Sequence, residues 1–356
     1  MKRIPVLDGM RGLAILLVIS AHTFSRPGPC LWLIPGFFGV TIFMVLSGFL
    51  ITRVMLADEE RSGRLRLGRF YQRRAWRILP ALYTFLLTVA MLSHAGIINA
   101  VTPQSWWAGA LYVRNLFGGE QQITEHLWSL GLEGQFYLVW PALFVSTRRF
   151  RFPFTICAVL ATSVLRFIAM HGGASWIALG GGFQADHVLY FNSFVRMDTF
   201  LMGAIFAMHP AKWTKSVPPV LIAGVALWPL PSWGTVWCIP VISFLIAILI
   251  CSLIENPRGF ESKLLSSKIL GGLGTVSYSI YLWQQLFLVQ NGVEALHWWS
   301  LPALAAVSAA SYWLIERPAL RMKDRDHIGD QLHGRDGRNR GLLRNPSDPD
   351  GRVALT

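Results

Sequence analysis

Charged side chains are scarce in this sequence of 356 residues. Asp, Glu, Lys and Arg together make up 14% of it, whereas 53% of its residues are hydrophobic. A soluble globule of this length needs more polar surface than so few charges provide. The composition therefore excludes a soluble fold and predicts a protein that lies in a membrane, with lipid as its first partner.

Cysteine and acidic residues are also few. The four cysteines, Cys30, Cys157, Cys238 and Cys251, lie far apart and form no C-x-x-C pair with nearby histidines, so we expect no bound metal. The 19 Asp and Glu face 32 Lys and Arg, which gives a net charge of +13. In a soluble protein this excess would indicate nucleic acid. The topology of a membrane protein explains it better, and we expect no nucleic-acid partner.

Long apolar runs recur along the chain, and each approaches the roughly 20 residues that a helix needs to cross a bilayer. Short charged or Pro/Gly-rich breaks separate them. We therefore predict an all-α fold, a polytopic membrane bundle of about ten transmembrane helices. The predicted spans are Leu7–Ser25, Gly36–Leu56, Trp76–Gly96, Leu127–Val145, Phe152–Met170, Phe194–Met208, Val217–Leu230, Val236–Ile254, Leu270–Gly292 and Trp298–Ile315.

Basic residues gather in every second connection between these spans. The positive-inside rule puts those connections and both termini in the cytoplasm, and leaves only Arg26 and Arg114 in the outer loops. Lys2 and Arg3 precede the first span, but Asp8 interrupts its beginning and no small-x-small cleavage site follows, so we expect a retained helix. These features predict a multi-pass protein of the plasma (inner) membrane.

Residues 1–320 form one predicted transmembrane domain. Residues 321–356 are rich in Arg, Asp, Gly and Asn and have few large apolar side chains, so they cannot bury enough surface to fold alone. We predict a disordered, basic cytoplasmic tail, whose charges could contact anionic lipid headgroups.

Ionisable side chains inside the spans are the first candidates for function, because each is unfavourable there unless it is paired or faces water. Arg11 and His22 lie on one face of the first span, about 16 Å apart along its axis. An imidazole can accept a proton from a hydroxyl, although a histidine that only hydrogen-bonds a neighbouring helix would look the same. Counting turns from the outer ends of the helices, we expect His22, Glu133 and Gln284 to share one polar layer, in which the carboxylate orients the imidazole.

An arginine-rich segment connects the second and third spans. Its later members, Arg73, Arg74 and Arg77, approach the point where a tunnel could open between the helices. Guanidinium groups bind phosphates with two parallel hydrogen bonds, so these residues could hold the phosphates of a nucleotide-like donor. Topology alone would also put positive charge here.

Two further charged positions have open interpretations. Arg196 and Asp198 begin the sixth span near the outer surface, where they could form an ion pair or contact a polar acceptor. Arg166, deep in the fifth span, needs a partner that the sequence does not identify.

Short motifs follow one another through the spans in a fixed order. They are Leu7-Asp8-Gly9-Met10-Arg11-Gly12 with the Arg-x10-His spacing to His22, Phe43 to Thr52, Arg73-Arg74, Arg77-Ile78-Leu79-Pro80, His126 to Leu130, Glu133 with Gln135, Phe136, Tyr137, Trp140 and Pro141, Arg196-Met197-Asp198, Ser277 to Trp283, and Ile315-Glu316-Arg317-Pro318. This ordered set resembles the acyltransferase 3 family of membrane-bound acyltransferases, and the resemblance covers almost the whole span region. One block alone would be weak evidence, whereas the ordered set is specific.

The resemblance implies a membrane-bound O-acyltransferase. Its donor would be an acyl-CoA, most often acetyl-CoA, which is a substrate rather than a bound cofactor. Its acceptor would be a hydroxyl of a carbohydrate, such as a surface polysaccharide or oligosaccharide. His22, Arg11 and Glu133 would be catalytic, and His22 would act either as a general base or as a brief carrier of the acyl group.

The other residues of the implied site fall into two groups. Ser47 and the arginines Arg73, Arg74 and Arg77 would bind the donor. The acceptor-side or supporting residues would be Trp128, Ser129, Gln135, Tyr137, Arg196, Asp198, Tyr278, Trp283 and Gln284.

Two positions depart from the family pattern. Gly134 follows Glu133 where members often have a second acid, so any role of two carboxylates falls to Glu133. Gln284 and Gln285 stand where many members have a histidine and a proline-containing turn, which leaves His22 as the only well-supported imidazole base. Because no hydrolase-like domain follows the spans in this sequence, we expect the membrane unit or a glycan-assembly protein to complete transfer to a distant acceptor.

A proton-coupled membrane transporter is the alternative from another class. In that case His22, Glu133, Arg166 and Arg196 would carry protons and substrate. The sequence has no convincing internal repeat of the kind that produces the inverted halves of many transporters. A donor-dependent acylated product would exclude this alternative.

Overall fold

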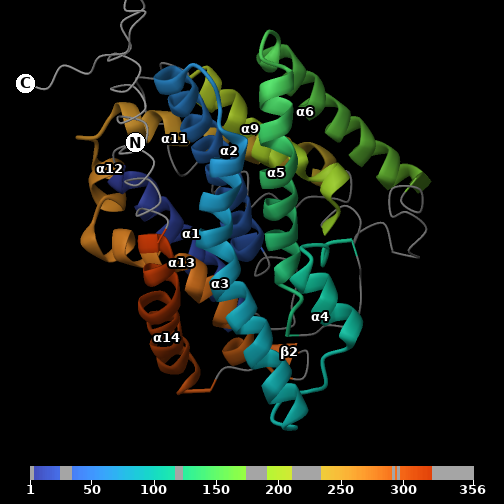
Figure 1. Cartoon of the computed structure of the whole chain (residues 1–356), viewed down its shortest axis with the longest axis vertical. Coiled ribbons are helices and arrows are strands. Elements are labelled where there is room, and N and C mark those ends of the chain that lie inside the picture. Colours follow the sequence, from blue (N-terminus) through green and yellow to red (C-terminus); the bar gives the residue numbers. More distant parts are fainter. Residues whose placement is uncertain are drawn as a thin grey trace, which may run out of the picture.

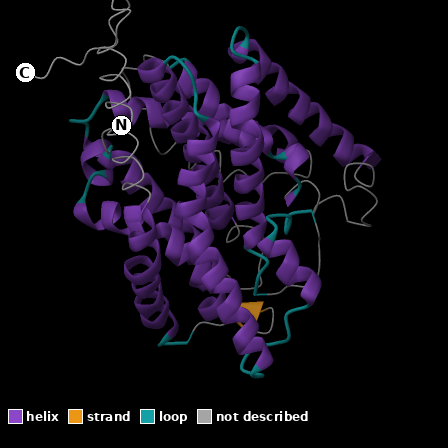
Figure 2. Ribbon diagram, in the orientation of Figure 1, coloured by secondary structure: helices purple, strands orange, loops and turns teal. Residues whose placement is uncertain are grey.

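The computed structural model describes residues 4–24, 34–116, 123–173, 191–210, 234–290, 293–294 and 297–322, and most of them are helical (Figure 1, Figure 2). Two antiparallel strands of two residues each pair with one another. The predicted all-α class is therefore confirmed. In chain order the elements are α1 (Pro5–Phe24), α2 (Ile34–Ser62), α3 (Leu67–His94), α4 (Pro103–Ala110), α5 (Leu127–Ser146), α6 (Arg151–Ile168), η1 (Ala169–Gly173), η2 (Ser193–Val195), α9 (Met197–Met208), α11 (Gly234–Glu255), α12 (Phe260–Leu265), α13 (Lys268–Leu288), β1 (Val289–Gln290), β2 (Val293–Glu294), α14 (Ser300–Ser311) and η3 (Tyr312–Glu316).

Several helices are suited to a bilayer. Each predicted span within the described residues coincides with a helix, whereas Val217–Leu230 and the predicted tail beyond residue 322 lie outside those residues. The chain is therefore a multi-pass membrane protein, as its apolar runs predict. Five described helices are long and apolar enough to cross a membrane: Pro5–Thr23, Gly36–Ser62, Leu67–His94, Arg151–His171 and Cys238–Glu255.

The arginine-rich segment was predicted to be a connection between two spans. In the structure it is largely helical. α3 begins at Leu67, well before the predicted span at Trp76, because the unbranched Arg and Gln side chains of this segment favour a helix. Arg73 and Arg74 are therefore adjacent on a regular helix, and Arg77 lies about one turn further along it. Pro80 lies inside the same helix and removes one backbone hydrogen bond from it.

α9 is shorter than the span predicted at Phe194–Met208. It has 12 residues, and the Ser193–Val195 segment before it forms a 3-10 turn instead. Asn192 stabilises that turn, because its side-chain oxygen accepts the backbone N–H of Phe194 at 2.9 Å. A helix of this length measures about 18 Å and cannot cross the roughly 30 Å hydrocarbon core alone.

The centre of the molecule is built on close contacts between helices. α1 packs against α13 and α2, and α2 packs against α9. Figure 1 shows α5 and α6 on one side and α12 and α14 on the other. Glycine permits the contact between α2 and α9, since a β-carbon on Gly48 would lie 1.9 Å from the carbonyl oxygen of Phe200 and one on Gly203 would lie 2.1 Å from that of Val45. Small residues allow membrane helices to approach in this way.

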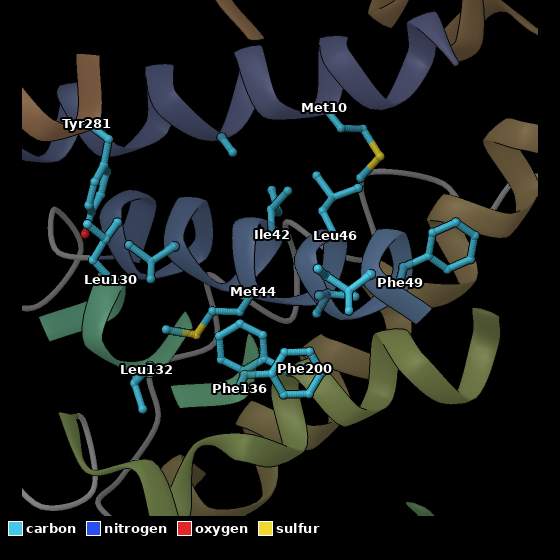
Figure 3. Close-up of a cluster of buried hydrophobic side chains, with 14 of the residues drawn as sticks. Met10, Ile42, Met44, Leu46, Phe49, Leu130, Leu132, Phe136, Phe200 and Tyr281 are labelled. Carbon is cyan, nitrogen blue, oxygen red and sulfur yellow. The ribbon is translucent and has the colours of Figure 1, made fainter. Parts of the chain in front are cut away.

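Aromatic stacking continues this core into α5. Figure 3 shows Met44 of α2 beside Phe136 of α5 and Phe200 of α9. The rings of Phe136 and Phe200 are stacked with their centroids 4.8 Å apart, and Phe136 also stacks on Trp140 at 5.8 Å. Each such pair contributes about 0.5–1.5 kcal/mol beyond its buried area. The stack therefore fixes the relative positions of α5 and α9.

Candidate active site

A cavity of about 50 Å³ lies where α1, α2, α5, α9 and α13 meet. A lining that combines apolar side chains with polar groups is typical of sites for small molecules. The polar part of its lining consists of Arg11, Ser47, Ser129, Glu133, Ser277, Tyr278 and Tyr281. The apolar part consists of Val40, Phe43, Met44, Leu130 and Phe200.

Glu133 is fixed at this cavity by two hydroxyl groups. Ser47 of α2 donates to its Oε1 at 2.6 Å, and Tyr137, one turn further along α5, donates to the same oxygen. Arg74 of α3 lies over the ring of Tyr137, with Cζ 5.0 Å from the ring centroid. Predicted residues from three helices thus meet at one carboxylate.

Arg11 brings a positive charge to the same cavity. Its Nε donates to Oγ of Ser277 on α13 at 3.4 Å, and its Cζ lies 5.7 Å from the ring centroid of Phe43. The charges of Glu133 and Arg77 both act on it. A guanidinium held opposite a carboxylate, in a small cavity of low dielectric constant, can stabilise the oxyanion that develops when a carbonyl is attacked.

Glu316 also belongs to this cluster, although its motif alone indicated no role. It is buried and accepts a hydrogen bond from Ser279 of α13, and the charges of Arg77 and Arg11 act on it. It ends η3, a π-helical turn of a kind that is frequent at functional sites. The sequence did offer one signal for Glu316, since an acidic residue at the end of an apolar span requires a partner.

The predicted donor-binding arginines follow the first half of α3. Arg74 and Arg77 act electrostatically on one another, and Glu133 acts on Arg74. Arg73 and Arg74 are half-buried, whereas Arg77 is exposed. This end of α3 therefore offers several guanidinium groups close to the cavity, as phosphate binding requires.

A second polar cluster surrounds His126, which directly precedes α5. Its backbone N–H donates to Oε1 of Gln285 at 3.0 Å, its Nδ1 contacts the same oxygen, and its Nε2 lies 3.0 Å from the carbonyl oxygen of Leu282. Tyr281, which lines the cavity, donates to the carbonyl oxygen of His126 at 3.0 Å. His22 and His126 act on one another electrostatically, which places His22 near this cluster.

The expected single polar layer is thus divided between two clusters. Glu133 shares the cavity with Arg11, whereas His22 lies about three turns further along α1, near His126. The first six residues of α5, 127–132, are buried, and α3 extends well past the start of α5 in Figure 1. The described partners of Glu133 are Ser47 and Tyr137, and its predicted role in orienting His22 stays a prediction.

Two predicted supporting residues lie at the cavity itself. The hydroxyl of Ser129 contacts that of Tyr281, which joins α5 to α13. The hydroxyl of Tyr278 donates to the carbonyl oxygen of Ile78 on α3 at 2.9 Å. Together these contacts hold the polar side of the cavity in place.

Three others lie in the interior around it. Trp128 meets Phe191 edge to face with centroids 4.9 Å apart, and Trp283 meets Phe85 in the same way at 5.4 Å. Gln284 is fully buried, and neither its Nε2 nor its Oε1 has a hydrogen-bond partner within the described residues. A buried amide with free hydrogen-bonding capacity is unusual, since such groups are normally paired.

Gln135 fastens the segment before α5. Its Nε2 donates to the carbonyl oxygen of Tyr112 at 2.8 Å and to Oδ1 of Asn115 at 2.9 Å. Tyr112 also explains why residue 134 is a glycine, because a β-carbon on Gly134 would lie 2.4 Å from Cδ1 of Tyr112. The packing of Tyr112 therefore excludes a second acid after Glu133.

Asp198 pairs with Arg166 rather than with Arg196. Its Oδ2 lies 2.6 Å from NH2 of Arg166, and both side chains have 0% of their surface exposed. Arg166 also donates through Nε to the carbonyl oxygen of Val195 at 3.0 Å. Arg196 is buried, with Cζ 5.0 Å from the ring centroid of Phe37. The sequence could not identify the partner of Arg166 because it comes from a different helix.

Comparisons with known proteins agree with the motifs. A family model described as an acyltransferase domain matches residues 4–317. The peptidoglycan O-acetyltransferase OatA of Listeria monocytogenes is 30% identical over 316 residues, which cover 79% of this chain and 49% of that protein. The O-acetyltransferase OatA of Staphylococcus aureus is 27% identical over 320 residues, which cover 81% of this chain and 51% of that protein. This chain thus spans about half the length of the curated relatives that it matches. No solved structure matches it.

The matched region contains both polar clusters and the cavity between them. Within the described residues, no group of three or more His, Cys, Asp and Glu side chains is arranged to hold a metal ion. The site therefore consists of an arginine, carboxylates, hydroxyls and imidazoles drawn from the motifs of a single family. The chain belongs to the acyltransferase 3 family of membrane-bound acyltransferases.

Proposed function

We propose that this protein moves an acyl group, most often acetyl, from a cytoplasmic acyl-CoA to a hydroxyl of a carbohydrate acceptor. The observation that carries the proposal is the cavity. Arg11 and Glu133 line it, and Tyr281 connects its lining to His126 and hence to the cluster near His22. A route of this kind lets a thioester reach an imidazole without opening the bundle to water.

The proposed topology has about ten spans with both termini in the cytoplasm, and the protein lies in the plasma (inner) membrane. The distribution of Lys and Arg supports this orientation. It puts the first half of α3 on the cytoplasmic side, where acyl-CoA is available. Arg73, Arg74 and Arg77 would bind the phosphates of the donor there, and Ser47 would contact the donor at the cavity.

The transfer itself needs a base. In a direct route, His22 accepts the proton of the acceptor hydroxyl as its oxygen attacks the thioester carbonyl, and the C–S bond breaks to release coenzyme A. In a relay, a nitrogen of His22 attacks first and carries the acyl group until the hydroxyl displaces it. Arg11 would help hold the donor or line its path toward His22, and Glu133 would orient Arg11.

The acceptor is proposed to be a glycan of the bacterial surface. The matched relative from Listeria is named for peptidoglycan, which supports a carbohydrate acceptor. Trp283 and Gln284 are the strongest acceptor-side candidates, because the indole Nε1 and the amide of these buried side chains have hydrogen-bonding capacity that no described residue uses. Glycan-assembly proteins are proposed as partners that present the acceptor.

Ester formation by the purified protein tests the proposal. Protein in lipid vesicles would receive labelled acetyl-CoA and an oligosaccharide acceptor, and the acceptor would be analysed for base-labile acetyl esters. We expect esters from the wild type and a large loss in the His22→Ala variant. Equal ester formation by that variant would refute the role of His22. Uptake of substrate without coenzyme A, and without ester, would replace the proposal with the transporter.

A further inference from the structure

We infer that the apolar part of the cavity selects the acyl group by its length and restricts transfer to acetyl-sized groups. Four of its five residues, Val40, Met44, Leu130 and Phe200, form what we call the acyl wall, and the fifth, Phe43, lies beside the guanidinium of Arg11. The inference rests on the proposed function, because it concerns the acyl group of the proposed donor.

The position of the cavity makes it the first part of the interior that an acyl group meets. The phosphates of an acyl-CoA lie at the opposite end of the molecule from the acyl group. If the phosphates are held at Arg74 and Arg77, the acyl group enters the bundle first. Arg74 lies over the ring of Tyr137, whose hydroxyl donates to the cavity-lining Glu133, so this end of α3 and the cavity adjoin. Tyr281 then leads from the cavity to the imidazole cluster.

The size of the cavity corresponds to a short acyl group. A water-sized group occupies about 10–15 Å³ of volume measured in this way. A cavity of about 50 Å³ therefore accepts about three to five such groups. Counted with the sulfur to which it is bonded, an acetyl thioester brings four heavy atoms and a butyryl thioester six. The acetyl thioester fits the cavity, and the longer chain must displace protein atoms.

The acyl wall resists such displacement. Met44, Leu130 and Phe200 appear together in the buried cluster of Figure 3, and their side chains are 3%, 5% and 0% exposed. Phe200 is held by its stacking on Phe136. α2 and α9 pack backbone against backbone at Gly48 and Gly203, so moving them apart would lose these close contacts. Well-packed interiors tolerate added methylenes poorly, so the wall discriminates by volume.

Arg11 and Ser277 also line the cavity and give the acyl group an orientation, because the carbonyl oxygen of a thioester would face their polar atoms. The methyl group then lies against the acyl wall, where an apolar group is favoured. The wall therefore measures the length of the acyl group as the thioester passes Arg11 toward His22.

A selectivity measurement tests the inference. The kcat/KM values for acetyl-CoA and butyryl-CoA would be compared with one acceptor in the wild type and in Met44→Ala. One surplus methylene in a tight pocket changes selectivity by about 10–200-fold. We expect the wild type to prefer acetyl by at least about tenfold, and we expect Met44→Ala to reduce that preference by about tenfold or more.

Met55→Ala is the matched control. Met55 is equally buried on the same helix, about three turns further along, and is absent from the described lining of the cavity. The preference of the Met55→Ala variant for acetyl-CoA should equal that of the wild type. Phe200→Leu enlarges the same wall with a smaller loss of packing, and should shift selectivity in the same direction if Met44→Ala does not fold.

The outcomes separate the inference from the proposed function. Unchanged selectivity in both wall variants would overturn the acyl wall while leaving the acyltransferase intact, and so would an equal shift in Met55→Ala. A wild type that forms no ester from either donor would instead refute the proposed function.

Discussion

Replacing Glu133 by Gln removes one negative charge from the cavity and leaves its shape nearly unchanged. In the structure Ser47 and Tyr137 donate hydrogen bonds to this carboxylate, and its charge acts on Arg11 and Arg74. A hydrogen bond to a charged group contributes about 1.5–3 kcal/mol, whereas one to a neutral group contributes about 0.5–1.5 kcal/mol. The substitution therefore weakens the two bonds by about 1 kcal/mol each, or about 2 kcal/mol together.

This loss should appear in the catalytic step. If Glu133 orients Arg11 for the transition state, about 2 kcal/mol corresponds to a fall in kcat of about 30-fold. The KM for acetyl-CoA should stay within about twofold, because the phosphates are bound elsewhere, on α3. Initial rates of ester formation in lipid vesicles, measured over a range of donor concentrations, separate the two constants. A thermal unfolding curve for each variant shows whether the fold is retained.

Variants of the two residues that hydrogen-bond Glu133 test the size of this effect on kcat. Ser47→Ala and Tyr137→Phe each remove one donor to the carboxylate, and each should lower kcat by about fivefold, the equivalent of about 1 kcal/mol. Combining Glu133→Gln with Ser47→Ala should give less than the product of the two effects, because contacting groups are coupled. A folded Glu133→Gln protein with wild-type kcat would show that Glu133 does not act in the catalytic step through Arg11. A rise in the KM for the donor with unchanged kcat would assign Glu133 to donor binding instead.

Three further predictions address other parts of the site. His22→Ala should lower donor-dependent ester formation by about 10²–10⁴-fold, the usual contribution of a positioned base, and a wild-type rate of ester formation would contradict this. Arg77→Gln should raise the KM for acetyl-CoA at least about fivefold but hardly change it for acetyl-pantetheine, which lacks the nucleotide. An equal effect on both donors would exclude phosphate binding. Asp198→Asn removes the buried counter-charge of Arg166 and should destabilise the protein by about 3–5 kcal/mol, visible as a lower midpoint of thermal unfolding, whereas an unchanged midpoint would count against a buried pair.

Much of the fold was predictable because lipid imposes one rule on every span. An apolar run of suitable length must satisfy its own backbone hydrogen bonds, and a helix does this locally. The rule says less about where a helix begins or ends. α3 starts early because its arginines favour a helix, and α9 starts late because Asn192 stabilises a 3-10 turn before it. Both effects are local side-chain chemistry that hydropathy does not record.

The contents of the site were more predictable than its arrangement. Charged residues inside apolar runs identified Arg11, His22 and Glu133, since each is unfavourable in lipid without a function or a partner. The partners come from distant segments: Ser47 is 86 residues from Glu133, and Gln285 is 159 residues from His126. No periodicity within one helix connects such pairs.

The separation of the two clusters suits a reaction between partners on opposite sides of a membrane. Coenzyme A carries several negative charges, and moving them into a medium of low dielectric constant is strongly unfavourable. In the proposed reaction these charges stay with the arginines of α3, and the uncharged pantetheine arm carries the acyl group into the cavity lined by Arg11 and Glu133. The acceptor then needs to approach only as far as His22, about 16 Å further along α1. Because a narrow cavity carries only a short acyl group over that distance, the same feature that keeps the donor's charges on the cytoplasmic side also limits the length of the acyl chain.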